Sequence, residues 1–373
     1  ALSGQMGPDA FTSEEVRRSL DLCVSCKGCK RECPTGVDMA RMKIEFLYQW
    51  QRRHGVALRA RLIATMPKWA PWAARLPWLF NLRDTLPGLA GLSEKWLGFA
   101  ARRTLPKWRR DTFLSAAPDE HAEDADVVLF ADTFNNYLEP GNARAALKVL
   151  RAAGYRVHVA RAARTDAQPT RPLCCGRTYL SAGLVDEARR EAQRVIEALR
   201  PFVARGVPVV GLEPSCLLSL RDEFLVMGLG DEAQALAKQS FLFEEFLARA
   251  HQAGTLKLDL KPLPQKRALL HGHCHQKAFD AVKPVQAVLG LVPGLEVQLI
   301  ESSCCGMAGS FGYEAGHYDI SMKMAELSLL PAVRAAGPDD LVVADGTSCR
   351  HQIADGAQRR AEHVACVLER ALP

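Results

Sequence analysis

Short apolar runs alternate with amphipathic stretches from residue 124 to the end of the chain. Runs such as VVLF and LVV have the length of buried strands, and the segments between them carry apolar residues at helical spacing. We predict strands at residues 124–132, 155–160, 207–216, 267–274, 295–306 and 341–349. We predict helices at 142–154, 184–200 and 315–329, and one beginning at 276. This alternation is typical of parallel sheets covered by helices.

The first third of the chain has a different pattern. Thr12 or Ser13 followed by acidic residues is a helix-start signature, and the apolar residues of 37–54 recur at helical spacing up to Gly55. Prolines interrupt residues 61–115, which predicts short helices or turns.

The α/β part contains a repeated cysteine pattern. Cys174-Cys175-Gly176 matches Cys304-Cys305-Gly306, and one further cysteine follows each pair, at Cys216 and Cys349. An internal duplication is therefore predicted, with its boundary near residues 255–266, which are polar and contain prolines. The predicted parts are a helical domain at 1–60, a Trp/Pro/Arg-rich helical connector at 61–120, and repeats at 121–260 and 261–373.

Composition narrows the class of protein. The chain has 373 residues, of which 48% are hydrophobic and 24% charged, as in globular proteins of two or three domains. It has no run of eighteen uncharged apolar residues and no secretory signal, so a cytoplasmic protein without a transmembrane helix is expected. The sequence begins without Met, so a processed chain or a piece of a longer protein is expected.

The net charge of +6 is unevenly placed. Residues 1–115 carry 20 Lys and Arg against 10 Asp and Glu, and the remainder carries 28 against 32. A basic first third suits an acidic partner domain or an anionic membrane surface. Nucleic acid is not expected to bind, because the basic residues form no recognisable binding motif.

The twelve cysteines predict bound metal, because they lie in closely spaced groups and nothing marks the chain for export. Cys23, Cys26, Cys29 and Cys33, with Pro34 directly after, have the spacing of a bacterial iron–sulfur ligand run. A four-cysteine zinc site more often uses two separated pairs, so this spacing favours iron–sulfur.

The second repeat offers Cys274, Cys304, Cys305 and Cys349 at or just after predicted strand ends. In parallel sheets these ends meet at one crevice, where the thiolates could hold a [4Fe–4S] cluster or zinc. The first repeat offers only Cys174, Cys175 and Cys216, with Thr133 at the fourth position. The first repeat either uses a ligand other than cysteine or has lost its metal, and the loss of the metal is the favoured interpretation.

Histidines and a lone cysteine accompany these groups. Three histidines alternate with other residues at a predicted strand end, namely His271, His273 and His275. They could form a proton relay, donate hydrogen bonds to a cluster, or bind a carboxylate. The alternative is that they are polar lining without a special role. His351 is expected to share the same crevice, and Cys366 is expected to be a core residue.

All six tryptophans lie between Trp50 and Trp108, among prolines and basic residues. One interpretation is a connector whose tryptophans pack against the neighbouring domains. The other is that residues 61–110 form an interfacial surface that contacts lipid or a quinone-bearing partner, on the inner face of the membrane.

The segments LDLCVSCKGCKRECPTGVDMA, PLCCG…EPSC and HCHQKA…ESSCCGMAGSFGYE…GTSC together resemble the iron–sulfur half of FAD-linked 2-hydroxyacid dehydrogenases of the D-lactate and D-2-hydroxyglutarate type. Related groups are the glycolate oxidase iron–sulfur subunit, the C subunit of anaerobic glycerol-3-phosphate dehydrogenase and the B subunit of heterodisulfide reductase. The resemblance implies a helical-ferredoxin domain followed by tandem α/β cysteine-rich (CCG) domains. It also implies FAD on an N-terminal oxidase domain or partner subunit, outside this chain.

The resemblance implies that electrons pass from this FAD through iron–sulfur clusters to an acceptor such as a quinone. One alternative is heterodisulfide-reductase-like thiol chemistry at a CCG-bound cluster, and another is a zinc-stabilised assembly scaffold. Because paired runs exchange their fourth cysteine, Cys33 is expected to serve a cluster whose other ligands lie upstream. The site of Cys23, Cys26 and Cys29 would then lack its fourth ligand in this chain.

Overall fold

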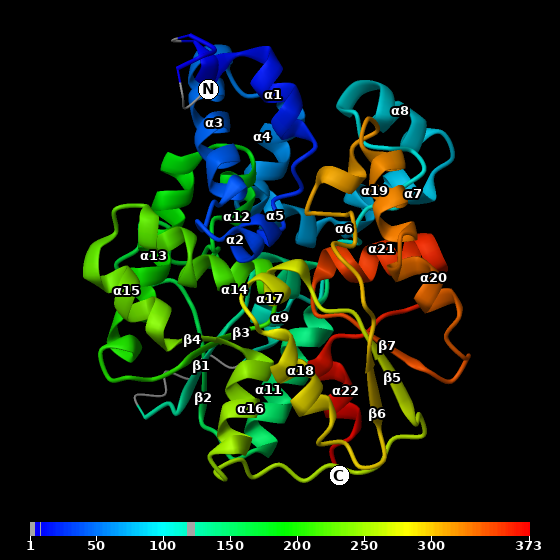
Figure 1. Cartoon of the computed structure of the whole chain (residues 1–373). Coiled ribbons are helices and arrows are strands. Elements are labelled where there is room, and N and C mark those ends of the chain that lie inside the picture. The colour runs from blue at the N-terminus through cyan, green and yellow to red at the C-terminus, as the bar shows by residue number, and fades with distance from the viewer. Residues whose placement is uncertain (1–3, 8, 118–123) are drawn as a thin grey trace.

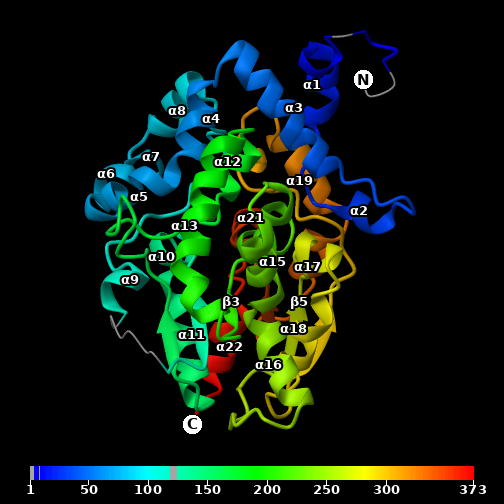
Figure 2. The same cartoon turned by 90° about the vertical axis from the view of Figure 1, so that its left-hand side faces the viewer.

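A computed structural model gives the fold and describes residues 4–7, 9–117 and 124–373. Figure 1 shows the N-terminal helices at one end of the molecule and two sheets below them. The C-terminus lies at the opposite end, and Figure 2 shows the same arrangement from the side. Among the described residues, no helix is long and apolar enough to cross a membrane.

The first third is helical, as predicted. Ser13 accepts a hydrogen bond from Val16 N and caps the first α-helix, Asp38 caps the long helix by accepting from Arg41 N, and Gly55 ends that helix. The elements up to residue 54 are η1 (Ala10–Thr12), α1 (Glu14–Asp21), α2 (Gly28–Glu32) and α3 (Met39–His54). The connector forms the short helices α4 (Leu58–Ala64), α5 (Met66–Arg75), α6 (Pro77–Phe80), α7 (Leu82–Thr85), α8 (Leu89–Leu97) and α9 (Phe113–Ala116).

The first sheet has four parallel strands in the order β2-β1-β3-β4. Its strands are β1 (Val127–Phe130), β2 (Val157–Val159), β3 (Val209–Gly211) and β4 (Ser240–Leu242). Its helices are α10 (Thr133–Tyr137), α11 (Pro140–Ala152), α12 (Arg177–Ser181), α13 (Val185–Val203), α14 (Pro214–Arg221), α15 (Gly230–Gln239) and α16 (Phe243–Gln252), with η2 (Glu223–Val226).

The second sheet has three parallel strands in the order β6-β5-β7. Its strands are β5 (Arg267–Leu270), β6 (Glu296–Leu299) and β7 (Leu341–Val343). Its helices are α17 (Cys274–Ala278), α18 (Val282–Leu289), α19 (Tyr318–Glu326), α20 (Leu329–Arg334), α21 (Thr347–Ala357) and α22 (Val364–Arg370), with η3 (Phe311–Tyr313). The α/β expectation with parallel sheets is thus confirmed.

The two sheet units share one hydrophobic core. Helix α11 of the first unit packs against α22 of the second, and α16 packs against α18. The buried residues of this core come from both units, including Val149, Leu247, Val288 and Val367. Because burial of such apolar side chains is the main favourable term in folding, the units stabilise each other.

The predicted strands extend too far toward their C-terminal ends, and β6, for example, ends at Leu299 rather than at Gly306. Strand β3 ends at Gly211, and Cys216 lies in α14, which begins at Pro214 because proline suits a first helical turn. Cys349 likewise lies in α21, and Cys274 is the first residue of α17 rather than the end of a strand. Strand β4 was not predicted, because its three residues between two helices have no pattern of their own.

Some tryptophans pack against their neighbours, as a connector would require, and others are exposed, as an interfacial surface would require. Trp69 and Trp108 pack with their ring centroids 5.1 Å apart. In contrast, Trp72, Trp78 and Trp96 on α5, α6 and α8 are 61%, 64% and 75% exposed.

Gly183 sets the contact between the N-terminal helices and the first sheet unit. It has a φ of +73°, and a Cβ at this position would lie 2.5 Å from the carbonyl carbon of Leu47 in α3. We expect Gly183→Ala to lower the free energy of unfolding by about 1–3 kcal/mol, because α3 must move away. The measurement is denaturant unfolding, with Gly206→Ala as the control. Gly206 has a φ of +75° and nothing within 4 Å, so equal losses would show that backbone strain alone is responsible.

Candidate metal centres

Each Cys-Cys-Gly sequence forms the same turn. Gly176 and Gly306 have φ values of +78° and +82°, in the left-handed region that favours glycine. The backbone N–H of each glycine donates to the first cysteine of its pair, Gly176 to Cys174 Sγ and Gly306 to Cys304 Sγ, both at 3.4 Å. A Cβ on Gly306 would also lie 2.3 Å from the carbonyl oxygen of Ser321. The turn therefore needs glycine, and it brings neighbouring thiols to one site.

The four cysteines of the second unit form a continuous series. Their side chains contact one another in the order Cys274, Cys304, Cys305 and Cys349. The hydrogen bond to Cys304, together with burial, raises the pKa of Cys274 far above its ordinary value. In the metal-free chain these thiols are therefore protonated, and binding a cation must displace their protons.

His271 adds a nitrogen donor to this series. One ligand atom each from His271, Cys305 and Cys349 lie within 4.8 Å of one another. The Nδ1 atom of His271 is hydrogen-bonded to Ser302 Oγ at 2.8 Å, whereas its Nε2 atom is buried without a hydrogen-bond partner. A buried polar atom without a partner is costly, and a metal centre beside it would supply one. The residues of the second unit thus fit a bound metal or cluster.

The first unit repeats the series with one replacement. Thr133, the first residue of α10, contacts Cys174, which contacts Cys175, which in turn contacts Cys216. Thr133 therefore occupies the place that Cys274 has in the second unit. The hydrogen bond to Cys175, followed by burial, raises the pKa of Cys174 well above its ordinary value.

The cysteine run near the N-terminus spans a loop that carries Cys23 and Cys26 and the short helix α2, which carries Cys29 and is followed by Cys33. Ser25 and Lys27 both have a positive φ, of 51° and 60°, which turns the chain sharply between the cysteines. Cys29 Sγ accepts a hydrogen bond from Met39 N at 3.3 Å. The thiol of Cys26 interacts electrostatically with Cys23, Cys29 and Cys274.

Cys33 lies apart from these contacts. Its Sγ is 3.1 Å from Thr35 Oγ1, and this hydrogen bond with nearby backbone N–H groups lowers the pKa of the Cys33 thiol. That Cys33 serves another cluster stays a prediction.

The loop of the N-terminal run touches the second sheet unit next to Cys274. The Nε2–H of His275 donates to the carbonyl oxygen of Ser25 at 3.1 Å. Ser25 directly precedes Cys26, and His275 directly follows Cys274. One hydrogen bond therefore joins the neighbours of two candidate ligands from different parts of the chain.

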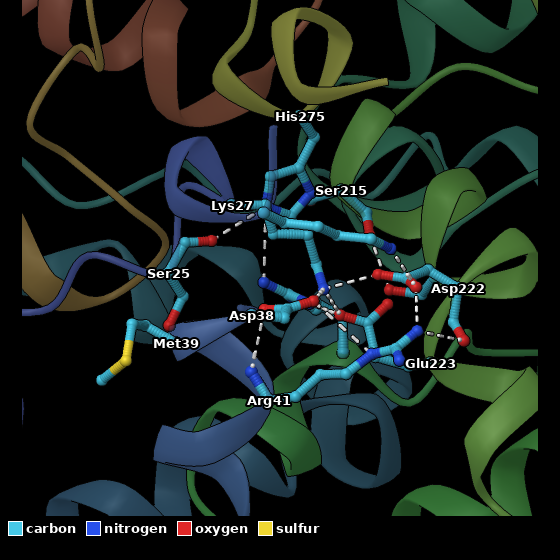
Figure 3. A network of polar contacts seen from close by, with 12 residues as sticks. Ser25, Lys27, Asp38, Met39, Arg41, Ser215, Asp222, Glu223 and His275 are labelled. Atoms are coloured by element: carbon cyan, nitrogen blue, oxygen red, sulfur yellow. Dashed lines mark hydrogen bonds and ion pairs between the residues drawn. The ribbon is translucent and has the colours of Figure 1, made fainter. Parts of the chain in front are cut away.

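A buried lysine holds this loop in place (Figure 3). Lys27 is 1% exposed, and its Nζ lies 2.6 Å from Asp222, 3.0 Å from Glu223 and 3.1 Å from Asp38. Burial lowers the pKa of Lys27, but Glu223 and Asp222 outweigh burial, so the net shift is upward. Lys27 therefore stays charged and ties the cysteine loop to the first sheet unit.

This ion network could not be predicted from the sequence. It joins Lys27 and Asp38 near the N-terminus to Asp222 and Glu223, which begin 195 positions after Lys27, and Arg177 pairs with Glu223 at 2.6 Å. A lysine between two cysteines of the run was the only available signal, and it is equally typical of an exposed charge.

The remaining candidates have separate roles. His273 accepts from His275 N at 3.1 Å and caps α17, and the rings of His273 and His275 lie edge to face with their centroids 5.3 Å apart. His351 is hydrogen-bonded to the Tyr313 hydroxyl at 2.7 Å. Cys366 packs against the shared core and donates to Asn142 Oδ1 at 3.3 Å.

Parallel sheets with paired cysteines on glycine turns, beside a buried histidine, define a cysteine-rich protein of the metal-binding CCG class. The profile of the CCG family, described as "Cysteine-rich domain", matches residues 268–354. The chain is 30% identical over 299 residues to the C subunit of the anaerobic glycerol-3-phosphate dehydrogenase of Escherichia coli K12, which covers 79% of this chain and 72% of that protein. The chain belongs to the family of this dehydrogenase subunit.

Two other relatives agree with this assignment. The D-2-hydroxyglutarate dehydrogenase of Escherichia coli K12 is 26% identical over 357 residues, which covers 91% of this chain but 33% of that protein. The probable glycolate oxidase iron-sulfur subunit of Bacillus subtilis is 23% identical over 396 residues, which covers 98% and 84%. The resemblance to the iron–sulfur half of 2-hydroxyacid dehydrogenases is thus confirmed.

Replacing Lys27 tests the ion network. We expect Lys27→Met to lower the free energy of unfolding by about 3 kcal/mol, because it removes the fully buried cation that three buried carboxylates share. The measurement is denaturant unfolding of the metal-free chain. The matched control is Lys30→Met, which removes a partner of the same Asp222, but from a side chain 32% exposed. We expect the control to cost less than about 1 kcal/mol, and equal losses would contradict a special role for Lys27.

Proposed function

We propose that this chain is an iron–sulfur electron-transfer module of a flavin-dependent 2-hydroxyacid dehydrogenase. Cys23, Cys26 and Cys29 contribute to one cluster site, and Cys274, Cys304, Cys305 and Cys349 form a second. The hydrogen bond from His275, which follows Cys274, to Ser25, which precedes Cys26, is the observation that carries the proposal. Electron transfer needs redox centres that lie close together, and the fold brings these two thiol groups together from opposite ends of the chain.

The surrounding residues support bound clusters at both sites. Iron–sulfur clusters, when bound, supply one-electron carriage at potentials that the protein sets through charge and hydrogen bonds. Lys277 interacts electrostatically with all four cysteines of the second unit, and Arg177 interacts with Cys175 and Cys274. These cations offset the negative charge of thiolates. The His271 ring and the Gly306 N–H are placed to donate toward sulfur.

The finer architecture is part of the proposal. We infer a helical-ferredoxin domain at residues 1–60 and a tandem duplication of CCG domains at 121–260 and 261–373, joined by the connector at 61–120. Equivalent packing supports the duplication. In the first unit, α11 is the second helix after the first strand, and it packs on α22, the last helix of the second unit. In the second unit, α18 has the same position, and it packs on α16, the last helix of the first unit. A pseudo-twofold arrangement of this kind is expected when two copies of one unit pair.

Electrons enter from FAD on a partner subunit or on a domain outside this chain, and leave to an acceptor such as a quinone. The names of the relatives, which include a glycolate oxidase subunit and a D-2-hydroxyglutarate dehydrogenase, support a 2-hydroxyacid as the electron source. The exposed Trp72, Trp78 and Trp96 support contact of the connector with a membrane surface or an acceptor protein.

Metal analysis tests the proposal. After anaerobic reconstitution with iron and sulfide, we expect the chain to hold both elements and, on reduction, to give an EPR signal. We expect Cys349→Ser to remove the larger share of the iron, because the thiol of Cys349 is buried within the complete series of four cysteines. The control is Cys366→Ser, which we expect to leave the iron content unchanged. Stoichiometric zinc without iron uptake would overturn the proposal in favour of a zinc-stabilised scaffold.

Thr133 tests whether the first unit has lost its metal. We expect Thr133→Cys to raise the iron and sulfide bound per chain, because it completes a series of four thiols. The control is Thr178→Cys, which adds a buried thiol of the same unit where the native hydroxyl donates to the carbonyl oxygen of Ala64 and to no cysteine. Equal iron in the two variants would contradict this interpretation, as would iron lost from the wild-type chain on Cys216→Ser.

A further inference from the structure

An open cavity of about 600 Å³ lies between the connector and the first sheet unit. Its walls come from α5, from residues 110–115, from the end of α10 and from the loop at residues 161–172. The volume falls within the range of small-molecule sites, about 300–1,000 Å³. None of the proposed ligand cysteines lines it, so it is not part of the metal centres.

The cavity is positively charged. Four arginines line it, namely Arg75, Arg110, Arg161 and Arg171, and none of its described lining residues is acidic. Arg171 is held by Glu191 through hydrogen bonds of 3.0 and 2.8 Å. Arg75 and Arg110 are exposed, and the guanidinium of Arg75 lies 5.0 Å from the ring centroid of Trp72. Guanidinium groups pair with carboxylates and phosphates, so the cavity suits an anion.

The arrangement of donors favours phosphate over carboxylate. The arginines come from three separate segments and therefore approach the cavity from different directions. A carboxylate presents two oxygens in one plane, whereas a phosphate presents oxygens in several directions. Thr112 and Thr170 also line the cavity and carry hydroxyls that can donate to a phosphate oxygen, whereas the Ser115 hydroxyl already donates to the carbonyl oxygen of Thr112 at 2.8 Å.

The cavity has room for more than a phosphate ion, and the helix α5 that forms one of its walls also carries an exposed tryptophan. Pro71 and Ala74 of α5 line the cavity, while Trp72 of the same helix is exposed. Trp78 and Leu79 on α6 are also exposed, by 64% and 47%. Tryptophan beside arginine is typical of the boundary between lipid and water.

We propose that this cavity binds the phosphate group of a phosphate ester, and that the ester is the headgroup of an anionic phospholipid or a soluble phosphate compound. The exposed tryptophans beside the cavity favour the phospholipid. The site is independent of the metal centres, so its test does not require bound iron.

The test uses the full chain and a double variant, Arg75→Gln with Arg110→Gln, because both side chains are exposed and can be replaced without disturbing the fold. Binding is measured by sedimentation with phosphatidylcholine vesicles, with and without phosphatidylglycerol, and by calorimetry with inorganic phosphate. We expect binding to phosphatidylglycerol vesicles that the double variant weakens by about tenfold or more. We also expect inorganic phosphate to compete with the vesicles.

The matched control is Arg52→Gln with Arg61→Gln, which removes two exposed arginines outside the cavity. If inorganic phosphate binds and vesicles do not, and only the cavity variant loses this binding, the ligand is a soluble phosphate compound. Equal weakening in both double variants would overturn the proposal, because general electrostatic attraction would then explain binding. The absence of binding to either probe would overturn it as well.

Discussion

Two adjacent cysteines can serve one centre only if the backbone turns sharply beside them, and the candidate sites of this chain depend on that constraint. In an extended strand, neighbouring side chains point to opposite faces. The left-handed conformation of Gly176 and Gly306 breaks this alternation directly after the thiols. The same residues let the chain approach the following helix closely, as the position of Gly306 beside Ser321 shows. Sheet, turn and thiol series are therefore one structural unit.

The part of the fold that depends on local pattern could be predicted from the sequence. The apolar runs at β1, β5 and β7 and the amphipathic stretch of α13 are visible without coordinates, since burial on a sheet or helix imposes a period. The ends of the strands were harder to predict from the sequence. The strand predicted to reach Cys216 runs through Glu213 and Pro214, which interrupt the apolar run, and Pro214 is the first residue of a helix.

The same distinction holds for the candidate sites: features set by local sequence could be predicted, and features set by long-range packing could not. The cysteine groups could be recognised in the sequence, because closely spaced cysteines are unusual outside metal sites. The equivalence of Thr133 with Cys274 could also be predicted, because each residue follows the first strand of its unit, β1 or β5. The unpartnered nitrogen of His271 could not be predicted, because it depends on how the ring is packed. The hydrogen bond between His275 and Ser25 could not be predicted either, because the two residues lie 250 positions apart and nothing local encodes such a contact.

The burial of Lys27 has a consequence for the order of assembly. Its hydrogen bond to Asp222 joins residues 195 positions apart, so the loop that carries Cys26 and Cys29 is held only after the first sheet unit has folded. A newly made chain therefore exposes its N-terminal thiols during most of its synthesis, when they are open to oxidation or to the wrong metal. The loop can then take its final form only at a late stage of synthesis, and a cell that makes this protein must keep these thiols reduced until the first sheet unit, which ends with α16, is complete.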